Sequence, residues 1–185
     1  IKERAETGRI YIMNVDHCNT HSSFKDKVYM SNLCQEITLP TKPLEHIDDP
    51  EGEIALCILS AINVGVLRNL DELKELCELA VRALEEIIDY QRYPIKAAEV
   101  STKARRSLGV GYIGLAHYLA SHQVKFEDKK SWQLVHDLSE AFQYYLLKAS
   151  NKLAQERGAC EYFDRTKYSV GILPIDTYKE QLDNI

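Results

Sequence analysis

The sequence lacks the features that would assign it to several large classes of protein. No apolar run in its 185 residues approaches the roughly 20 residues that a membrane helix requires. Lys and Arg never cluster beyond a pair and the net charge is −5, which argues against nucleic-acid binding through phosphates. The N-terminus carries neither a signal peptide nor an initiator Met, so we expect a segment of a longer protein that is neither secreted nor membrane-bound.

The cysteines also exclude some classes. There are five, at positions 18, 34, 57, 77 and 160, and none forms a C-x-x-C pair. An odd number without pairing motifs argues against a secreted disulfide framework and favours the reducing cytoplasm. His17, Cys18 and His21 could suggest a metal site, but no second ligand cluster completes a tetrahedral set. We therefore interpret residues 16–21 as a structural polar loop and predict no bound metal.

What the chain does contain is an ordinary globular composition, 45% apolar and 28% charged, in a length that suits one domain. Strands are predicted where β-prone residues gather, at 9–15, 27–30 and 54–66, the last covered on both faces and followed by a helical turn. Apolar residues at helical spacing predict four helices. The first begins at a cap formed by Asn69, with Glu72 completing a capping box, and stops at Pro94. The others are predicted at 95–107, 115–121 and 131–157. Cys77 should pack within the first of these helices, and Gly158 should cap the last. Residues 39–53 and the tail from 162 read as irregular.

Residues 109–114 match the letters of the dinucleotide-binding pattern G-x-G-x-x-G. That pattern requires a preceding strand, whereas basic, helix-like sequence precedes it here. We reject the dinucleotide interpretation and expect these glycines to let the chain pass close to a neighbouring segment. Lys96, Lys103, Arg105 and Arg106 are interpreted as a solvated helix face rather than as an anion site.

The stretch with the most chemical content is Ser-Asn-Leu-Cys-Gln-Glu-Ile at residues 31–37. In an extended chain Asn32, Cys34 and Glu36 would share one face, at spacings of about 6.5 Å. They combine an amide, a redox-active thiol and a proton acceptor. A free cysteine at a strand end is also commonly a passive core residue, and the spacing alone leaves that alternative open.

The string Asn-Leu-Cys-Gln-Glu-Ile resembles the active-site loop of the large (α) subunit of class I ribonucleotide reductase. Five further stretches resemble the same subunit in the same order, at residues 8–17, 54–57, 105–111, 144–151 and 171–178. Together with the loop at 31–37 they extend the resemblance over essentially the whole chain. The resemblance implies an α/β fold that is about half of a ten-stranded α/β barrel, with long amphipathic helices. Residues 1–185 would then be one segment of the catalytic barrel domain, with the active-site cysteine loop at about 31–38.

The resemblance also implies roles for particular residues. Cys34 would become a thiyl radical, Glu36 would act as general base, and Asn32 would hydrogen-bond the substrate hydroxyls. Cys57 would be one member of the redox-active cysteine pair, and Cys18 does not match the motif of the missing partner. The reaction would reduce ribonucleotides, with diphosphates favoured, to deoxyribonucleotides. Since the relay tyrosines and the effector sites lie outside the matched stretches, we expect the segment alone to be inactive.

The resemblance further implies a homodimeric, cytoplasmic parent that works with a metal-radical small subunit and with thioredoxin or glutaredoxin, under control of ATP and deoxynucleotide effectors. This segment itself should bind no cofactor. Three alternatives remain open at this point: a cobalamin-dependent ribonucleotide reductase, an α/β interaction module with passive cysteines, and a cysteine hydrolase that uses His17 or His21. Glu36 opposes the hydrolase because a nearby carboxylate disfavours thiolate formation.

Overall fold

The computed structural model describes residues 1–178, and the chain divides into two compact units. The first contains residues 1–56, 93–105 and 160–185, and the second contains residues 57–92 and 106–159. The chain therefore passes from the first unit to the second and back twice. No helix within residues 1–178 is both long and apolar enough to cross a membrane.

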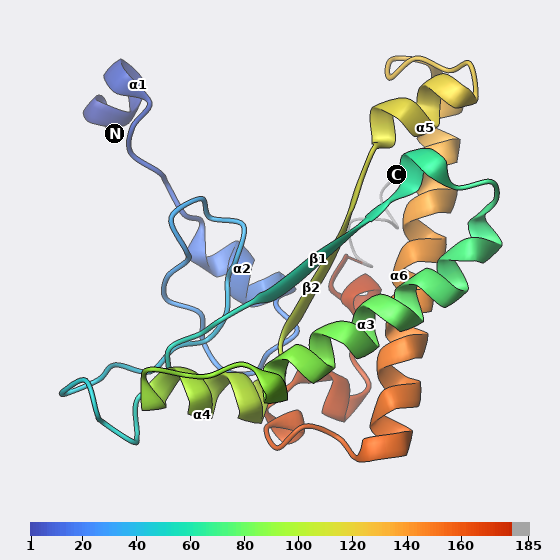
Figure 1. Ribbon diagram of the computed structural model, residues 1–185. Helices are drawn as coiled ribbons and strands as arrows, with labels where there is room; N and C mark the ends of the chain where they lie inside the picture. Colours follow the sequence, from blue (N-terminus) through green and yellow to red (C-terminus); the bar gives the residue numbers. More distant parts are fainter. Residues whose placement is uncertain (179–185) are drawn as a thin grey trace. The chain divides into compact units, whose positions relative to one another are not determined.

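The second unit is built on a parallel pair of strands, β1 (Ile58–Asn63) and β2 (Leu108–Ile113) (Figure 1). Their register pairs Ile58 with Leu108 and Asn63 with Ile113. β1 ends in a 3-10 turn, η1 (Val64–Val66), whose Gly65 N–H donates to the Asn63 side chain at 3.1 Å. The strand and helical turn predicted within 54–66 are confirmed. The parallel pairing requires a crossover, which residues 64–107 supply.

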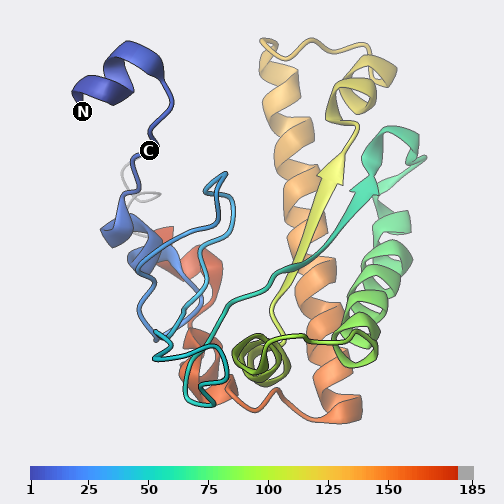
Figure 2. The same ribbon diagram turned by 60° about the vertical axis from the view of Figure 1, so that its left-hand side comes forward.

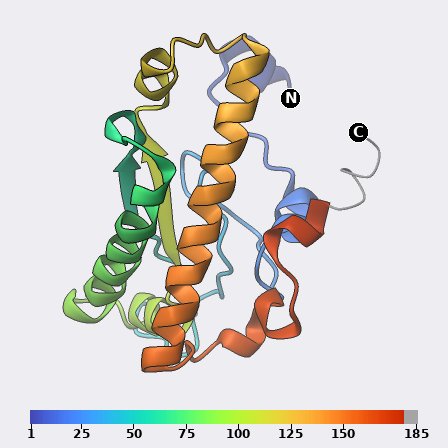
Figure 3. The same ribbon diagram turned by 90° about the vertical axis from the view of Figure 1, so that its right-hand side faces the viewer.

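Two long helices, α3 (Leu73–Tyr90) and α6 (Lys129–Arg157), cover one face of this strand pair (Figures 2 and 3). The 3-10 turn η2 (Leu70–Glu72) leads into α3, and α5 (Leu115–Ser121) follows β2. Asn69 accepts the Asp71 N–H at 3.0 Å, so it does cap this helical segment. Glu72 does not complete the capping box: its carboxylate instead accepts hydrogen bonds from Arg68.

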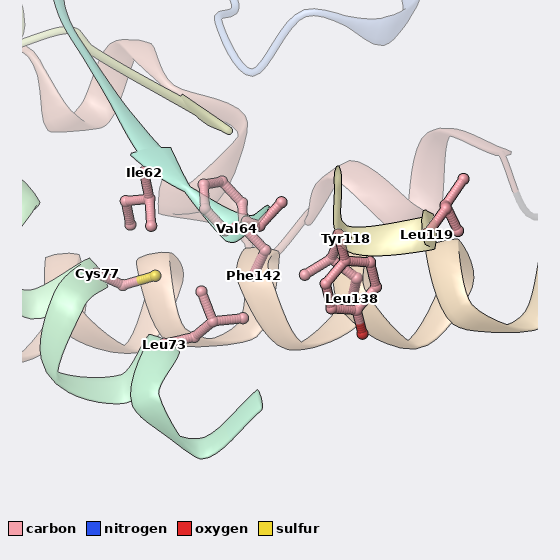
Figure 4. Packing of buried hydrophobic residues seen from close by; sticks show 8 residues of the cluster. All are labelled: Ile62, Val64, Leu73, Cys77, Tyr118, Leu119, Leu138 and Phe142. Atoms are coloured by element: carbon pink, nitrogen blue, oxygen red, sulfur yellow. The ribbon is translucent and has the colours of Figure 1, made fainter. Parts of the chain in front are cut away.

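The core of the second unit joins these elements (Figure 4). Its buried members come from β1, η1, α3, α5 and α6: Ile62, Val64, Leu73, Cys77, Tyr118, Leu119, Leu138 and Phe142. The apolar spacing in the sequence thus located the buried faces of the helices, and Cys77 is a core residue as predicted. β1 is covered on one face only, since Leu59 on the other face is 58% exposed. The prediction of a strand covered on both faces is wrong within this segment.

The described part of the first unit contains three α-helices, α1 (Lys2–Thr7), α2 (Val15–His21) and α4 (Lys96–Arg105). Its carboxyl-terminal part consists of 3-10 turns: η3 (Phe163–Arg165), η4 (Lys167–Val170) and η5 (Pro174–Tyr178). The irregular tail predicted from residue 162 is confirmed through residue 178, and residues 179–185 lie outside the described part. Isolated antiparallel bridges join Phe24 to Thr166 and Lys42 to Glu53.

Charged side chains organise the interior of the first unit. Arg105 and Glu53 are almost fully buried and hydrogen-bonded, and Asp26 accepts from both Arg105, at 2.9 Å, and Arg165, at 2.7 Å. Both guanidiniums lie over the ring of Tyr162. The solvated basic face predicted for α4 is therefore wrong at Arg105. Lys96 and Lys103 do remain at the surface, paired with Glu99.

Two predicted strands are not strands in the structure. Residues 9–14 form no ladder, and Ile10, Tyr11 and Ile12 are each about half exposed. The prediction of a polar loop at 16–21 is wrong, because α2 covers all of these residues. Residues 27–30 are likewise unpaired in a sheet. A β-prone run becomes a strand only when another strand supplies its hydrogen-bond partners, and the described residues supply none to either run.

Candidate active site

The cysteine loop is a tight turn in the first unit. The Gln35 N–H donates to the Asn32 carbonyl at 3.2 Å, and the Asn32 N–H donates to the Ile37 carbonyl at 3.3 Å. The Asn32 side-chain oxygen also accepts the Ile37 N–H at 3.0 Å, which closes the loop from inside. Gln35 has a φ of +63°, a left-handed conformation that a non-glycine residue adopts only when its surroundings hold it there.

This geometry corrects the reason that we gave for grouping Asn32, Cys34 and Glu36. Side chains alternate between two faces only along an extended backbone, and the turn at 32–35 interrupts that alternation. The hydrogen bonds of Asn32 close the loop that contains all three residues. The catalytic roles assigned to them do not follow from this geometry and stay predictions.

Within the loop, Cys34 and Glu36 are exposed and Asn32 is half-buried. The Asn32 amide nitrogen makes no hydrogen bond to the described residues, because closure of the loop uses only the side-chain oxygen. The turn therefore carries a thiol, a carboxylate and an amide donor pair within five residues, 32–36. Together these can bind a hydroxyl, transfer a proton and exchange a hydrogen atom or an electron.

Cys57 lies in the second unit, immediately before β1, and is half-buried. Gly109 on β2 keeps space for it: a Cβ at that position would lie 3.0 Å from the Cys57 sulfur and 2.5 Å from Leu59 Cδ2. The expectation that the glycines at 109–114 let the chain pass close to a neighbour is confirmed at Gly109 and Gly114 and is wrong at Gly111, whose missing Cβ would have nothing within 4 Å. Any residue larger than glycine at 109 would have to displace Leu59 and crowd the Cys57 thiol.

The segment that leads into the loop is held by a residue that the sequence analysis missed. Asn19, on α2, donates to the Val28 carbonyl at 2.9 Å and accepts the Val28 N–H at 2.8 Å. Val28 itself is completely buried, while Tyr29 and Met30 are exposed. No local pattern marks Asn19 for this contact, since the two residues lie nine positions apart and meet only in the folded chain.

The residues considered for a metal site have other contacts. His21 stacks on Tyr178 with 4.2 Å between ring centroids, and its Nδ1 lies 3.2 Å from the Thr177 hydroxyl. In residues 1–178, no three His, Cys, Asp or Glu side chains are grouped so that they could hold a metal ion. The described part of the chain therefore offers polar and thiol chemistry at the cysteine loop rather than metal coordination.

Comparison with known proteins gives a consistent result over the full length. The family model described as "Ribonucleotide reductase, barrel domain" matches residues 1–184. The chain is 61% identical to the ribonucleoside-diphosphate reductase subunit alpha of Haemophilus influenzae and 59% identical to the ribonucleoside-diphosphate reductase 1 subunit alpha of Escherichia coli. It is 44% identical to the corresponding subunit of Enterobacteria phage T4. These matches cover 99–100% of this chain but only 24–25% of each relative, so the chain spans about a quarter of their length.

Proposed function

The chain belongs to the ribonucleotide reductase barrel-domain family, and on that premise we propose that it forms the part of a catalytic subunit that carries the reactive cysteine. The family match identifies its α/β fold as a portion of that barrel, in agreement with the sequence prediction. The substrate proposed is a ribonucleoside diphosphate, because that is the substrate in the names of the relatives. The product is the corresponding deoxyribonucleotide.

The proposed reaction begins at Cys34. Its sulfur, as a thiyl radical, removes the hydrogen atom from the 3′-carbon, and Glu36 takes the proton of the 3′-hydroxyl. Asn32 holds the substrate hydroxyls through its amide nitrogen. The 2′-oxygen leaves as water, two thiols including Cys57 supply two electrons and two protons and become a disulfide, and Cys34 returns the hydrogen to the 3′-carbon. The ribose thus loses one oxygen for each disulfide formed.

The observation that supports this proposal most directly is the closed turn at 32–37. It holds an amide donor pair, an exposed thiol and an exposed carboxylate within six residues of a chain that matches the family throughout. The reaction needs these three groups around one sugar ring. A passive role for the cysteines would leave Cys34 without a reason to occupy an exposed turn.

Several parts of the complete enzyme lie outside this segment. We propose a metal-radical small subunit that generates the thiyl radical, thioredoxin or glutaredoxin as reductant, ATP and deoxynucleotides as allosteric effectors, and a homodimeric parent in the cytoplasm. The segment itself would bind no cofactor. A cobalamin-dependent reductase is the second candidate within the family, and a requirement for cobalamin in place of the small subunit would identify it.

The test uses the full-length subunit together with its radical-generating partner. Cys34→Ser should abolish turnover, because a serine hydroxyl holds its hydrogen too strongly to form the required radical. Cys57→Ser should permit the first step but remove the electron source, so the nucleotide should decompose and release free base. Cys18→Ser is the matched control, because Cys18 lies in the same unit as Cys34. The subunit with this change should turn over normally.

Each variant is also examined by thermal melting. Cysteine-to-serine changes are small in volume, so a purely structural role would show as loss of stability with a proportional loss of activity. Substantial turnover by Cys34→Ser, or normal turnover by Cys57→Ser without external thiols, would refute the assigned roles.

A further inference from the structure

The cysteine loop must be held in position from outside, because its own hydrogen bonds only close it on itself. Asn32 joins both ends of the turn at Ile37, which fixes the shape of the loop but not its location. On the entry side, residues 27–30 belong to no sheet, and Tyr29 and Met30 are exposed. Before residue 26 the chain is held at Lys25, which bonds to Asp164, Arg165 and Ser169; nearer the loop, the contacts of this side are at Asp26 and Val28.

Asn19 gives Val28 the contacts that a neighbouring strand would give. Its amide oxygen accepts the Val28 N–H and its amide nitrogen donates to the Val28 carbonyl, at 2.8 and 2.9 Å. The same nitrogen donates its other hydrogen to the Val15 carbonyl at 2.9 Å, which fixes the side-chain orientation against α2. Both backbone polar groups of the completely buried Val28 are thus satisfied by one side chain.

The contact at Asp26 is of a different kind. Asp26 is held by Arg105 and Arg165, and Arg105 also pairs with the buried Glu53. Changing that network would leave buried charges without partners and would destabilise the whole unit. The Asn19–Val28 contact is neutral and half-buried, so its removal leaves two backbone groups without partners but no buried charge, and it costs less stability than a change in the ion network.

We propose that Asn19 is a positioning residue for the Cys34 loop, holding the entry segment at Val28 so that the thiol is presented at a fixed place to the substrate. Asn19 touches neither the loop nor any reacting atom and acts only through the backbone of residue 28. The proposal rests on the function proposed above for Cys34. A small displacement of a hydrogen-abstracting atom slows the abstraction step steeply, since the reacting atoms must lie close and aligned.

The experiment compares Asn19→Ala and Lys167→Met in the full-length subunit with its radical-generating partner. The Lys167 ammonium donates to the Asn19 and Thr20 carbonyls at the end of α2, so its removal weakens the same helix without touching Val28. Asn19→Ala should lower kcat by about tenfold or more. Lys167→Met should leave kcat within about twofold of the unchanged protein.

Two further measurements separate positioning from simple loss of folded protein. Substrate deuterated at the 3′-carbon should show a larger isotope effect on kcat in Asn19→Ala, because hydrogen abstraction becomes the slow step. A smaller folded fraction would lower kcat and leave the isotope effect unchanged. Amide exchange in residues 26–37 should accelerate by about tenfold, while exchange in α3 stays as in the unchanged protein.

Asn19→Asp provides a second variant with almost the same shape. It keeps an oxygen for the Val28 N–H but loses both amide donors, so it should also lower kcat and raise the isotope effect. The proposal is overturned if Asn19→Ala keeps the normal kcat and isotope effect, if kcat falls only in proportion to the folded fraction, or if both variants fail to fold. If Cys34→Ser retains turnover, the proposed function itself fails, and that result is independent of Asn19.

Discussion

The Arg105 guanidinium holds the Glu53 carboxylate through two hydrogen bonds, 2.8 Å from Nε and 2.6 Å from Nη2, although 52 residues separate them. Their side chains are only 3% and 6% exposed. The pair ties the end of α4 to the end of the loop at 39–53. Removing the Glu53 charge should destabilise the buried Arg105, because Asp26 would then be its one remaining counter-charge among the described residues.

We therefore expect Glu53→Gln to destabilise the protein by about 3 kcal/mol. Glutamine has nearly the same volume, so the loss reports the missing charge opposite Arg105 rather than a cavity. Glu51→Gln serves as the control: the Glu51 side chain is 81% exposed and pairs with Lys42 at the surface, so the change should alter stability by less than about 0.5 kcal/mol. Urea unfolding of both variants measures the difference, and equal effects would contradict this account of the pair.

Two nearby glycines should respond in opposite ways to substitution by alanine. Gly114 has a φ of +83°, and a Cβ there would lie 2.4 Å from the Asn63 side-chain oxygen and 3.0 Å from the Gly65 nitrogen. Gly114→Ala should therefore cost about 2 kcal/mol. Gly111, in β2, has nothing within 4 Å of its missing Cβ, so Gly111→Ala should be neutral or stabilising by up to about 1 kcal/mol.

Thermal melting of the two glycine variants measures both effects. Equal destabilisation by Gly111→Ala would show that its position is occupied by another part of the folded protein. An unchanged melting temperature for Gly114→Ala would show that the turn between β2 and α5 can relax around a methyl group.

The buried thiol of Cys77 predicts a dependence of stability on alkaline pH. Burial raises the pKa of Cys77 from its ordinary value of 9.0 to about 11. Above pH 9 the unfolded chain loses this proton while the folded protein keeps it, which favours unfolding. The stabilisation is thus complete below pH 9 and is lost as pH rises toward 11, by at most about 1.4 kcal/mol per pH unit.

The measurement is urea unfolding at pH 8 and pH 10 for the unchanged protein and for Cys77→Ala. At pH 8 the variant should be less stable by about 1 kcal/mol, because it leaves a small cavity in the core. At pH 10 the difference should shrink, since only the unchanged protein loses stability through this thiol. Burial also raises the pKa of Tyr118, but that contribution is present in both proteins and cancels. If the stability difference between the unchanged protein and Cys77→Ala is the same at pH 8 and at pH 10, the prediction is contradicted.

The sequence by itself determined the helices of the second unit and the family. Apolar spacing predicted a helix at 115–121 with the bounds that the structure shows, and it located the buried faces of α3 and α6 together with Cys77. Gly158 ends α6, donating its N–H to the Ala154 carbonyl. Helices are predictable in this way because their hydrogen bonds are local and their buried faces recur at a fixed period. The matching motifs identified the family for the same reason, since each is a short run of consecutive residues.

Only the tertiary structure decided the organisation of the first unit. The β-prone runs at 9–15 and 27–30 are not strands, because strand formation depends on a partner that no local pattern specifies. Arg105 is buried because Glu53 and Asp26 meet it from distant parts of the chain. Asn19 satisfies the backbone of Val28, nine residues away, through two hydrogen bonds that form only in the folded chain. The sequence therefore singled out the candidate residues of the cysteine loop, whereas the contacts that hold the surrounding segments arise from pairings that only folding brings together.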